Sequence, residues 1–174
     1  MELASSDADV EIVWRAFELR PDPAPTLDPD GEYLHRVWGS SVYPMAERLG
    51  MTIRLPPVQP RSRRAHEAAH WARGCGRFDE YNAAVFRAFF ERGENIGEIG
   101  VLVKLAADLG LDEAALRASL ETREFELAVI EDERLAQALG LSGVPAFVAG
   151  RKAALSGVQT VAGLRELIEH VRAA

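Results

Sequence analysis

The chain has 174 residues, enough for one domain, and its hydrophobic (48%) and charged (27%) fractions are those of a globular rather than a disordered protein. A formal net charge of −7 argues against nucleic acid as the main partner, and no apolar run approaches the roughly 20 residues that a membrane helix needs. Cys75 is the one cysteine, so no internal disulfide forms, and the acidic residues 1–9 do not resemble a secretory signal. We therefore expect a cytoplasmic protein.

A strand is predicted over residues 10–19, because apolar side chains occupy alternate positions at Val10, Ile12 and Trp14. Residues 21–30 contain four prolines and are predicted to form a loop. Ser62 and Asp112 are candidate N-caps of helices. Periodic apolar residues predict a series of helices over residues 33–49, 62–72, 77–92, 99–109, 113–121 and 124–139.

The pattern changes after Gly140. Residues 145–149 and 152–156 predict two short strands around a Gly150–Arg151 turn, and Thr160 opens a last helix that runs to about Val171. The order of elements is that of an α/β protein with a helical insertion between its first strand and a C-terminal hairpin and helix.

Several segments resemble a known family. Residues 143–148, Gly-Val-Pro-Ala-Phe-Val, resemble the strand that begins at a cis-proline in thioredoxin-fold proteins. Residues 156–159, Ser-Gly-Val-Gln, resemble the "SGAQ" segment of FrnE-like members of the DsbA family, and residues 10–21, 63–67 and 95–97 are similar to its second strand and helical insertion. Nearly the whole chain thus resembles the DsbA-like branch of the thioredoxin superfamily.

The resemblance implies a thioredoxin-like fold in a single domain, residues 1–174. Residues 20–140 would be the mostly helical insertion, and residues 10–19 and 141–174 the remaining thioredoxin core. Family members begin with a strand and a helix that carries Cys-x-x-Cys, whereas here nine residues precede the predicted strand and no Cys-x-x-Cys occurs. Thiol–disulfide exchange needs an attacking thiolate and a resolving cysteine, so we expect this chain alone to be inactive in that cycle.

Val144 and Pro145 are the substrate-binding residues that the resemblance implies. In the family, the loop at this proline faces the active cysteines, and the residue before it pairs with substrate backbone. The other interpretation is a strand-starting proline that only shapes the fold. Cys75 follows a helix end and has no partner cysteine. We therefore interpret Cys75 as an incidental thiol rather than a catalytic group, and we identify no catalytic residue.

His66, Glu67 and His70 match the His-Glu-x-x-His pattern of zinc metallopeptidases, in which two histidines on one helix face bind the metal. No third ligand is identifiable, and the same helix fits the family insertion. We interpret it as an ordinary surface helix and predict neither metal nor cofactor. The acidic run at residues 131–133 is interpreted as a solvated helix face. An aromatic stripe in the helix at residues 77–92 is predicted to be core: Phe78, Tyr81, Val85, Phe86 and Phe89.

Three functional hypotheses follow. The chain is an oxidoreductase homologue that lacks its catalytic segment, a non-catalytic peptide-binding or chaperone-like module, or a relative of glutathione-dependent isomerases of the 2-hydroxychromene-2-carboxylate type. The expected partners are a polypeptide or small thiol substrate, with neither nucleic acid nor membrane. Because the strands at residues 10–19 and 145–149 would each lack a neighbour, we also expect a homodimer.

Overall fold

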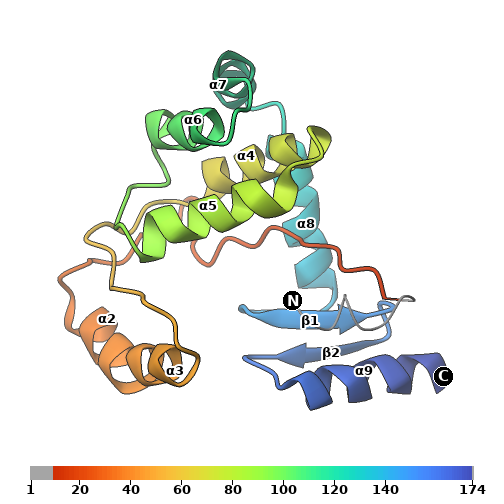
Figure 1. Cartoon of the computed structure of the whole chain (residues 1–174). Helices are drawn as coiled ribbons and strands as arrows, with labels where there is room; N and C mark the ends of the chain where they lie inside the picture. The colour runs from red at the N-terminus through yellow and green to blue at the C-terminus, as the bar shows by residue number, and fades with distance from the viewer. Residues whose placement is uncertain (1–9, 174) are drawn as a thin grey trace. The chain divides into compact units, whose positions relative to one another are not determined.

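The computed structural model describes residues 10–173 of the chain. They form two compact units (Figure 1). The helical unit comprises residues 20–129, and the hairpin unit comprises residues 10–19 and 130–173.

The helical unit contains the predicted series of helices. The region predicted at residues 33–49 is one helical run interrupted by a π-helical turn, which directly precedes α3 and its Pro44. Pro44 has no N–H to donate to the preceding turn, which accounts for an interruption of the regular helix here. The elements of the unit, with the helix that leads out of it, are α2 (Glu32–Val37), η1 (Trp38–Val42), α3 (Tyr43–Arg48), α4 (Arg63–Gly74), α5 (Phe78–Phe90), α6 (Ile99–Asp108), α7 (Glu113–Thr122) and α8 (Glu126–Ala138).

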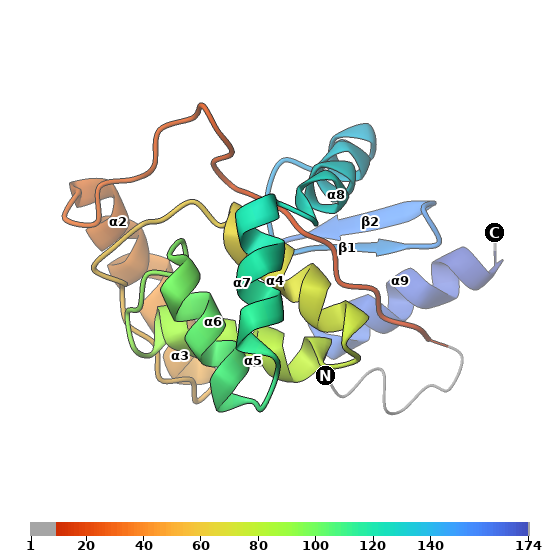
Figure 2. The same ribbon diagram turned by 90° about the horizontal axis from the view of Figure 1, so that it is seen from above.

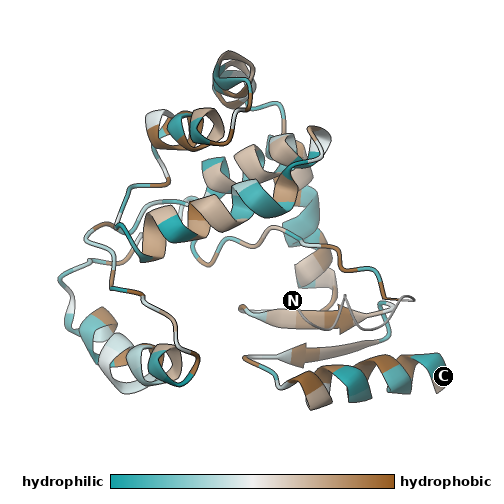
Figure 3. Cartoon of the chain, in the orientation of Figure 1, coloured by the Kyte–Doolittle hydropathy of each residue, from teal (hydrophilic) through white to brown (hydrophobic). Residues whose placement is uncertain are grey.

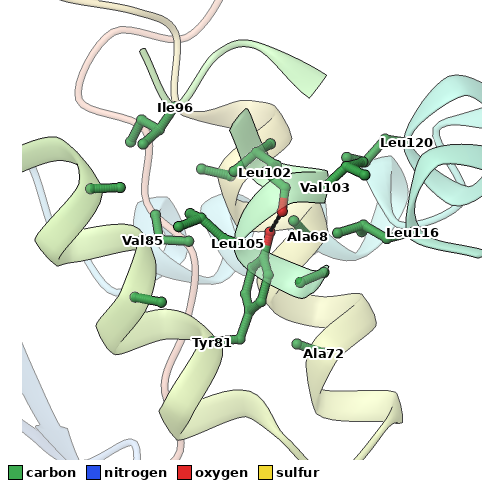
Figure 4. Packing of buried hydrophobic residues seen from close by; sticks show 14 residues of the cluster. Ala68, Ala72, Tyr81, Val85, Ile96, Leu102, Val103, Leu105, Leu116 and Leu120 are labelled. Carbon is green, nitrogen blue, oxygen red and sulfur yellow. Dashed lines mark hydrogen bonds between the residues drawn. The ribbon is translucent and has the colours of Figure 1, made fainter. Parts of the chain in front are cut away.

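The core of the helical unit lies among α4, α5, α6 and α7 (Figure 4). Alanines of α4 and α5 allow these helices to approach closely, and leucines of α6 and α7 fill the remaining space. The Tyr81 hydroxyl is fully buried and donates to the Leu102 carbonyl at 2.9 Å, so the phenol is satisfied inside the core. Tyr81 and Val85 are buried as predicted, but Phe86 is 51% exposed. Phe86 lies one residue, about 100° of helix rotation, beyond the core-facing row.

Local chemistry explains most of the helix ends. The Asp112 carboxylate accepts from the amides of Ala114 and Ala115 at 3.0 Å, as an N-cap should. Gly110 and Gly140 follow α6 and α8 with positive φ. The prediction for Ser62 is wrong in one respect, because its side chain makes no cap bond at the start of α4.

The hairpin unit contains β1 (Ala146–Ala149), β2 (Ala153–Ser156) and α9 (Val161–Ala173), with the last part of α8. The strands pair antiparallel with Phe147 opposite Leu155, and both residues of the Gly150–Arg151 turn have positive φ. Helix α9 packs against both strands (Figure 2), so closely that a Cβ on Gly150 would lie 2.7 Å from Val171 Cγ1. Glycine at this turn therefore serves both the backbone conformation and the packing.

The strand predicted at residues 10–19 is not formed. Within the described residues the sheet contains only β1 and β2, and residues 10–18 run without regular secondary structure. The alternation of apolar residues is typical of a strand, but a strand also needs a neighbour for its backbone N–H and C=O groups. Here the Ala16 amide donates to the side chain of Asp132 instead.

Candidate functional site

The loop that opens β1 is the candidate substrate-binding site. Helix α8 is followed by Gly140, and four residues further the chain reaches Val144 and the cis Val144–Pro145 peptide bond. The Pro145 carbonyl accepts from the Gly157 amide at 2.8 Å, so the loop is tied to the residue that follows β2. Val144 is 49% exposed, and its side chain is therefore available to a ligand.

One edge of β1 has no strand beside it among the described residues. Backbone groups alternate in direction along an antiparallel strand. The Pro145 carbonyl bonds to Gly157, so the backbone groups of Phe147 and Ala149 also point toward β2. The N–H and C=O groups of Ala146 and Val148 therefore face the open edge. These groups are the donors and acceptors that an added peptide strand uses.

Residues 156–159 support the loop from the other side. The Gln159 amide nitrogen donates to the carbonyls of Ser156 at 2.8 Å and Gly157 at 3.3 Å. Gly157 has φ of +80°, a conformation that side chains rarely adopt. Thr160 then caps α9 by accepting from the Gly163 amide at 3.1 Å. Gly157 and Gln159 thus fix the turn between β2 and α9, next to Pro145.

Asp132 anchors the N-terminal segment of the hairpin unit. Its carboxylate accepts from the Ala16 amide and pairs with the Arg15 guanidinium, both at 2.9 Å. Asp132 is 3% exposed, so the prediction that residues 131–133 form a solvated face is wrong at this position. The Asp132 carboxylate replaces part of the hydrogen bonding that a neighbouring strand would supply. An acidic side chain in an otherwise periodic helix gives no signal of this role in the sequence.

Cys75 is exposed and ends α4 rather than beginning α5. Its amide donates to the Trp71 carbonyl at 3.2 Å, and Arg77 is the residue that precedes α5. The carbonyl end of a helix does not favour an anion.

The helix with the His-Glu-x-x-His pattern is α4. His70 is partly buried and stacks on Phe125, with ring centroids 6.3 Å apart and planes inclined by 10°. Glu67 is 2% exposed, which corrects the interpretation of α4 as an ordinary surface helix. Among residues 10–173, no three side chains of His, Cys, Asp or Glu gather as a metal site would require.

Glu67 is a buried carboxyl whose Oε2 has no hydrogen-bond partner in the described part of the chain. Burial raises the pKa of Glu67, and the nearby Glu126 carboxylate raises it further, while Arg63, Arg123 and Arg64 oppose the shift. Glu126 lies 3.8 Å from the Arg63 guanidinium and 3.6 Å from that of Arg123. The sequence pattern singles out Glu67 for metal chemistry and misses its burial.

Glu67 should make the stability of the protein depend on pH in a defined direction. The pKa of Glu67 is higher in the folded than in the unfolded protein. Its contribution therefore lowers the free energy of unfolding as pH rises from the unfolded pKa to the folded pKa, and the loss remains at higher pH. Glu67→Gln removes the charge. We expect its free energy of unfolding to exceed that of the wild type by about 1 kcal/mol at about pH 8, where the wild type holds a desolvated charge, and by less at about pH 4, where Glu67 binds its proton more fully.

Urea unfolding of both proteins at the two pH values measures this difference. The exposed Glu121→Gln is the matched control and should show no such trend. If the gain of Glu67→Gln were the same at both pH values, Glu67 would not be the titrating group.

The arginines near the start of α4 are engaged within the protein. Arg61 pairs with Asp22 at 3.1 Å, and Arg64 donates to the Gly97 carbonyl at 3.2 Å. They are therefore not a preformed anion site. In the part of the chain that the structure describes, no helix is both long enough and apolar enough to cross a bilayer.

The fold is a thioredoxin-like one, and comparisons with known proteins identify the family. Residues 1–169 match the DSBA-like thioredoxin domain, and the chain belongs to this family. The uncharacterized protein YwbO of Bacillus subtilis (strain 168) is 40% identical over 155 residues, which cover 86% of this chain and 76% of that protein. The crystal structure of a probable DsbA oxidoreductase from Streptomyces coelicolor matches with a TM-score of 0.79 and 26% identity, over 99% of this chain and 81% of that one.

Proposed function

We propose that the chain is part of a DsbA-family thiol–disulfide oxidoreductase of the FrnE-like branch, and that Val144 and Pro145 contact its substrate. The observation that carries the proposal is the loop at Pro145, which presents a half-exposed Val144 beside the open edge of β1 in a chain of this family. The Ser-Gly-Val-Gln segment at residues 156–159, which supports that loop, favours the FrnE-like branch.

The redox step of such a protein needs two cysteines. One thiolate attacks a substrate disulfide, forms a mixed disulfide and releases a substrate thiolate; the second cysteine then displaces the substrate and leaves the enzyme oxidised by two electrons. Cys75 alone does not complete this cycle. We therefore propose that a Cys-x-x-Cys segment outside these 174 residues supplies the pair, and reading the genomic sequence upstream of Met1 tests this directly.

The 174-residue chain should not catalyse the reduction of insulin by dithiothreitol. Cys75 is its one thiol, so each encounter stops at a mixed disulfide that dithiothreitol must resolve. Insulin turbidity should therefore develop at the rate seen with dithiothreitol alone, both for the wild type and for Cys75→Ser.

An extended chain that restores an upstream Cys-x-x-Cys segment should accelerate the turbidity, and Cys75→Ser should leave that acceleration intact. Turnover by the 174-residue chain that disappears in Cys75→Ser would show that Cys75 is catalytic. Stop codons immediately upstream, in place of an in-frame Cys-x-x-Cys, would overturn the proposal of a missing segment.

The second candidate function is a non-catalytic module that binds extended peptide. The backbone groups of Ala146 and Val148 that face the open edge of β1 favour it, because they suit strand addition without any thiol chemistry. The two functions differ in what the extended chain does, because a binding module would retain a peptide substrate but would not accelerate the reduction of insulin. We also propose that, in the 174-residue chain, a second copy occupies this edge.

A further inference from the structure

The helical unit has an aromatic surface far along the chain from the loop at Pro145. We define it as Tyr43, Phe86, Phe90 and Arg54. Phe86 stacks on Phe90 with centroids 6.0 Å apart, and Trp38 contacts both Phe90 at 6.2 Å and Tyr43 at 5.4 Å. Trp38 is buried, whereas Tyr43 is 42% exposed and Phe86 51% exposed. The buried indole thus joins the exposed rings from beneath.

Backbone bonds make this surface continuous. The segment that follows α3 is joined to both sides of this surface: the Arg54 amide donates to the Phe90 carbonyl at 2.8 Å, and the Leu55 amide donates to the Tyr43 hydroxyl at 3.1 Å. Leu49 and Met51, at the start of the same segment, are also exposed. Exposed apolar residues that gather in this way, rather than singly, mark interaction sites.

Charge around the aromatic surface differs in sign from the rest of the protein. Residues 42–55 and 86–91 contain three arginines, Arg48, Arg54 and Arg87, against two glutamates, whereas the whole chain has a net charge of −7. None of these arginines forms an ion pair with another described residue, and all three are exposed. A partner that complements this surface is apolar and acidic.

We propose that the aromatic surface binds an extended polypeptide segment that carries aromatic or aliphatic side chains and carboxylates. Arginine and exposed rings also suit single-stranded nucleic acid, but a chain this acidic repels a polyanion over its remaining surface. A short acidic peptide meets only the local positive charge and buries its apolar side chains on the rings. This inference is independent of the thiol chemistry and of the Pro145 loop.

Fluorescence anisotropy with a labelled synthetic peptide tests the proposal. The acidic probe alternates Phe and Glu with Gly and Ser spacers. Two further peptides have Lys in place of Glu or Ser in place of Phe. The fourth probe is labelled oligothymidylate. The acidic probe should bind the whole chain more tightly than the others, and its affinity should fall as salt is raised to about 0.5 M, where exposed charges are screened.

Phe86→Ser should weaken binding of the acidic probe about tenfold, since it removes roughly half a phenyl ring of buried apolar contact. Arg54→Glu should weaken it by about fivefold and flatten its salt dependence. The matched controls are Leu127→Ser, at an exposed leucine outside this surface, and Arg117→Glu, at an exposed arginine of α7; both should bind like the wild type.

Arg54→Glu changes only an exposed side chain, so it decides the matter even if Phe86→Ser unfolds. Equal affinity of wild type and Arg54→Glu for the acidic probe would overturn the proposal. So would tighter binding of oligothymidylate or of the lysine probe. A dimer that dissociates in Phe86→Ser would assign the surface to a second copy of the chain and would overturn it as well.

Discussion

Asp132→Ala should lower the free energy of unfolding by about 3 kcal/mol. The substitution removes the acceptor of the Ala16 amide and the partner of Arg15 at once, both of which lie 2.9 Å from a carboxylate that is almost fully buried. Hydrogen bonds to charged groups contribute about 1.5–3 kcal/mol each, and the Ala16 amide would be left buried without an acceptor. Arg15 itself is half exposed, so its share is the smaller one.

Urea unfolding measures the loss, and hydrogen exchange at the Ala16 amide locates it. Asp132→Asn keeps an oxygen acceptor and should recover part of the stability. The control is Asp108→Ala, which breaks an exposed pair with Lys104 on α6 and should change the free energy by less than about 0.5 kcal/mol. A loss at Asp132 no larger than that at Asp108 would mean that residues 10–19 are held by other contacts.

The helical elements were predictable because their signals are local. Apolar residues at helical spacing, Asp112 before α7 and glycine after α6 and α8 act within one or two turns of the chain. The hairpin was predictable for the same reason, since the Gly150–Arg151 turn sets its position. Residues that resemble a family supplied the fold class and the candidate site at Val144 and Pro145, which composition and periodicity alone did not give.

The larger errors concern contacts distant in sequence, whereas those at Ser62 and Phe86 are local. Residues 10–19 have the alternation of a strand, but strand formation depends on a neighbour that no local pattern reveals (Figure 3 shows the apolar residues of this segment). Glu67 and Asp132 are carboxyls in amphipathic helices and would ordinarily face water. Their burial follows from what packs over α4 and α8, which the sequence around them does not encode.

The open edge of β1 leads to the second large effect. The strand Ala146–Ala149 contains no charged residue and no bulge, which are features that normally protect an edge. Its short length and Pro145 at its start are the protective features that it does have. Two copies related by a twofold axis would pair their β1 strands antiparallel through the groups of Ala146 and Val148. The exposed side chains of Val144 and Val148 would be partly buried in the same contact.

We therefore expect light scattering at micromolar concentration to give twice the mass of the chain, and Val148→Pro to give the mass of a monomer. Proline removes the one N–H of Val148, which faces the open edge, while the bonds of Phe147 and Ala149 to β2 stay intact. Val148→Thr keeps the N–H and a β-branched side chain, so it should remain dimeric.

The charge of −7 on each copy opposes association, but salt screens it beyond about 8 Å, whereas strand pairing acts at contact distance. A wild-type monomer that binds no hydrophobic dye would exclude this dimer, and a dimer that persists in Val148→Pro would place the interface elsewhere.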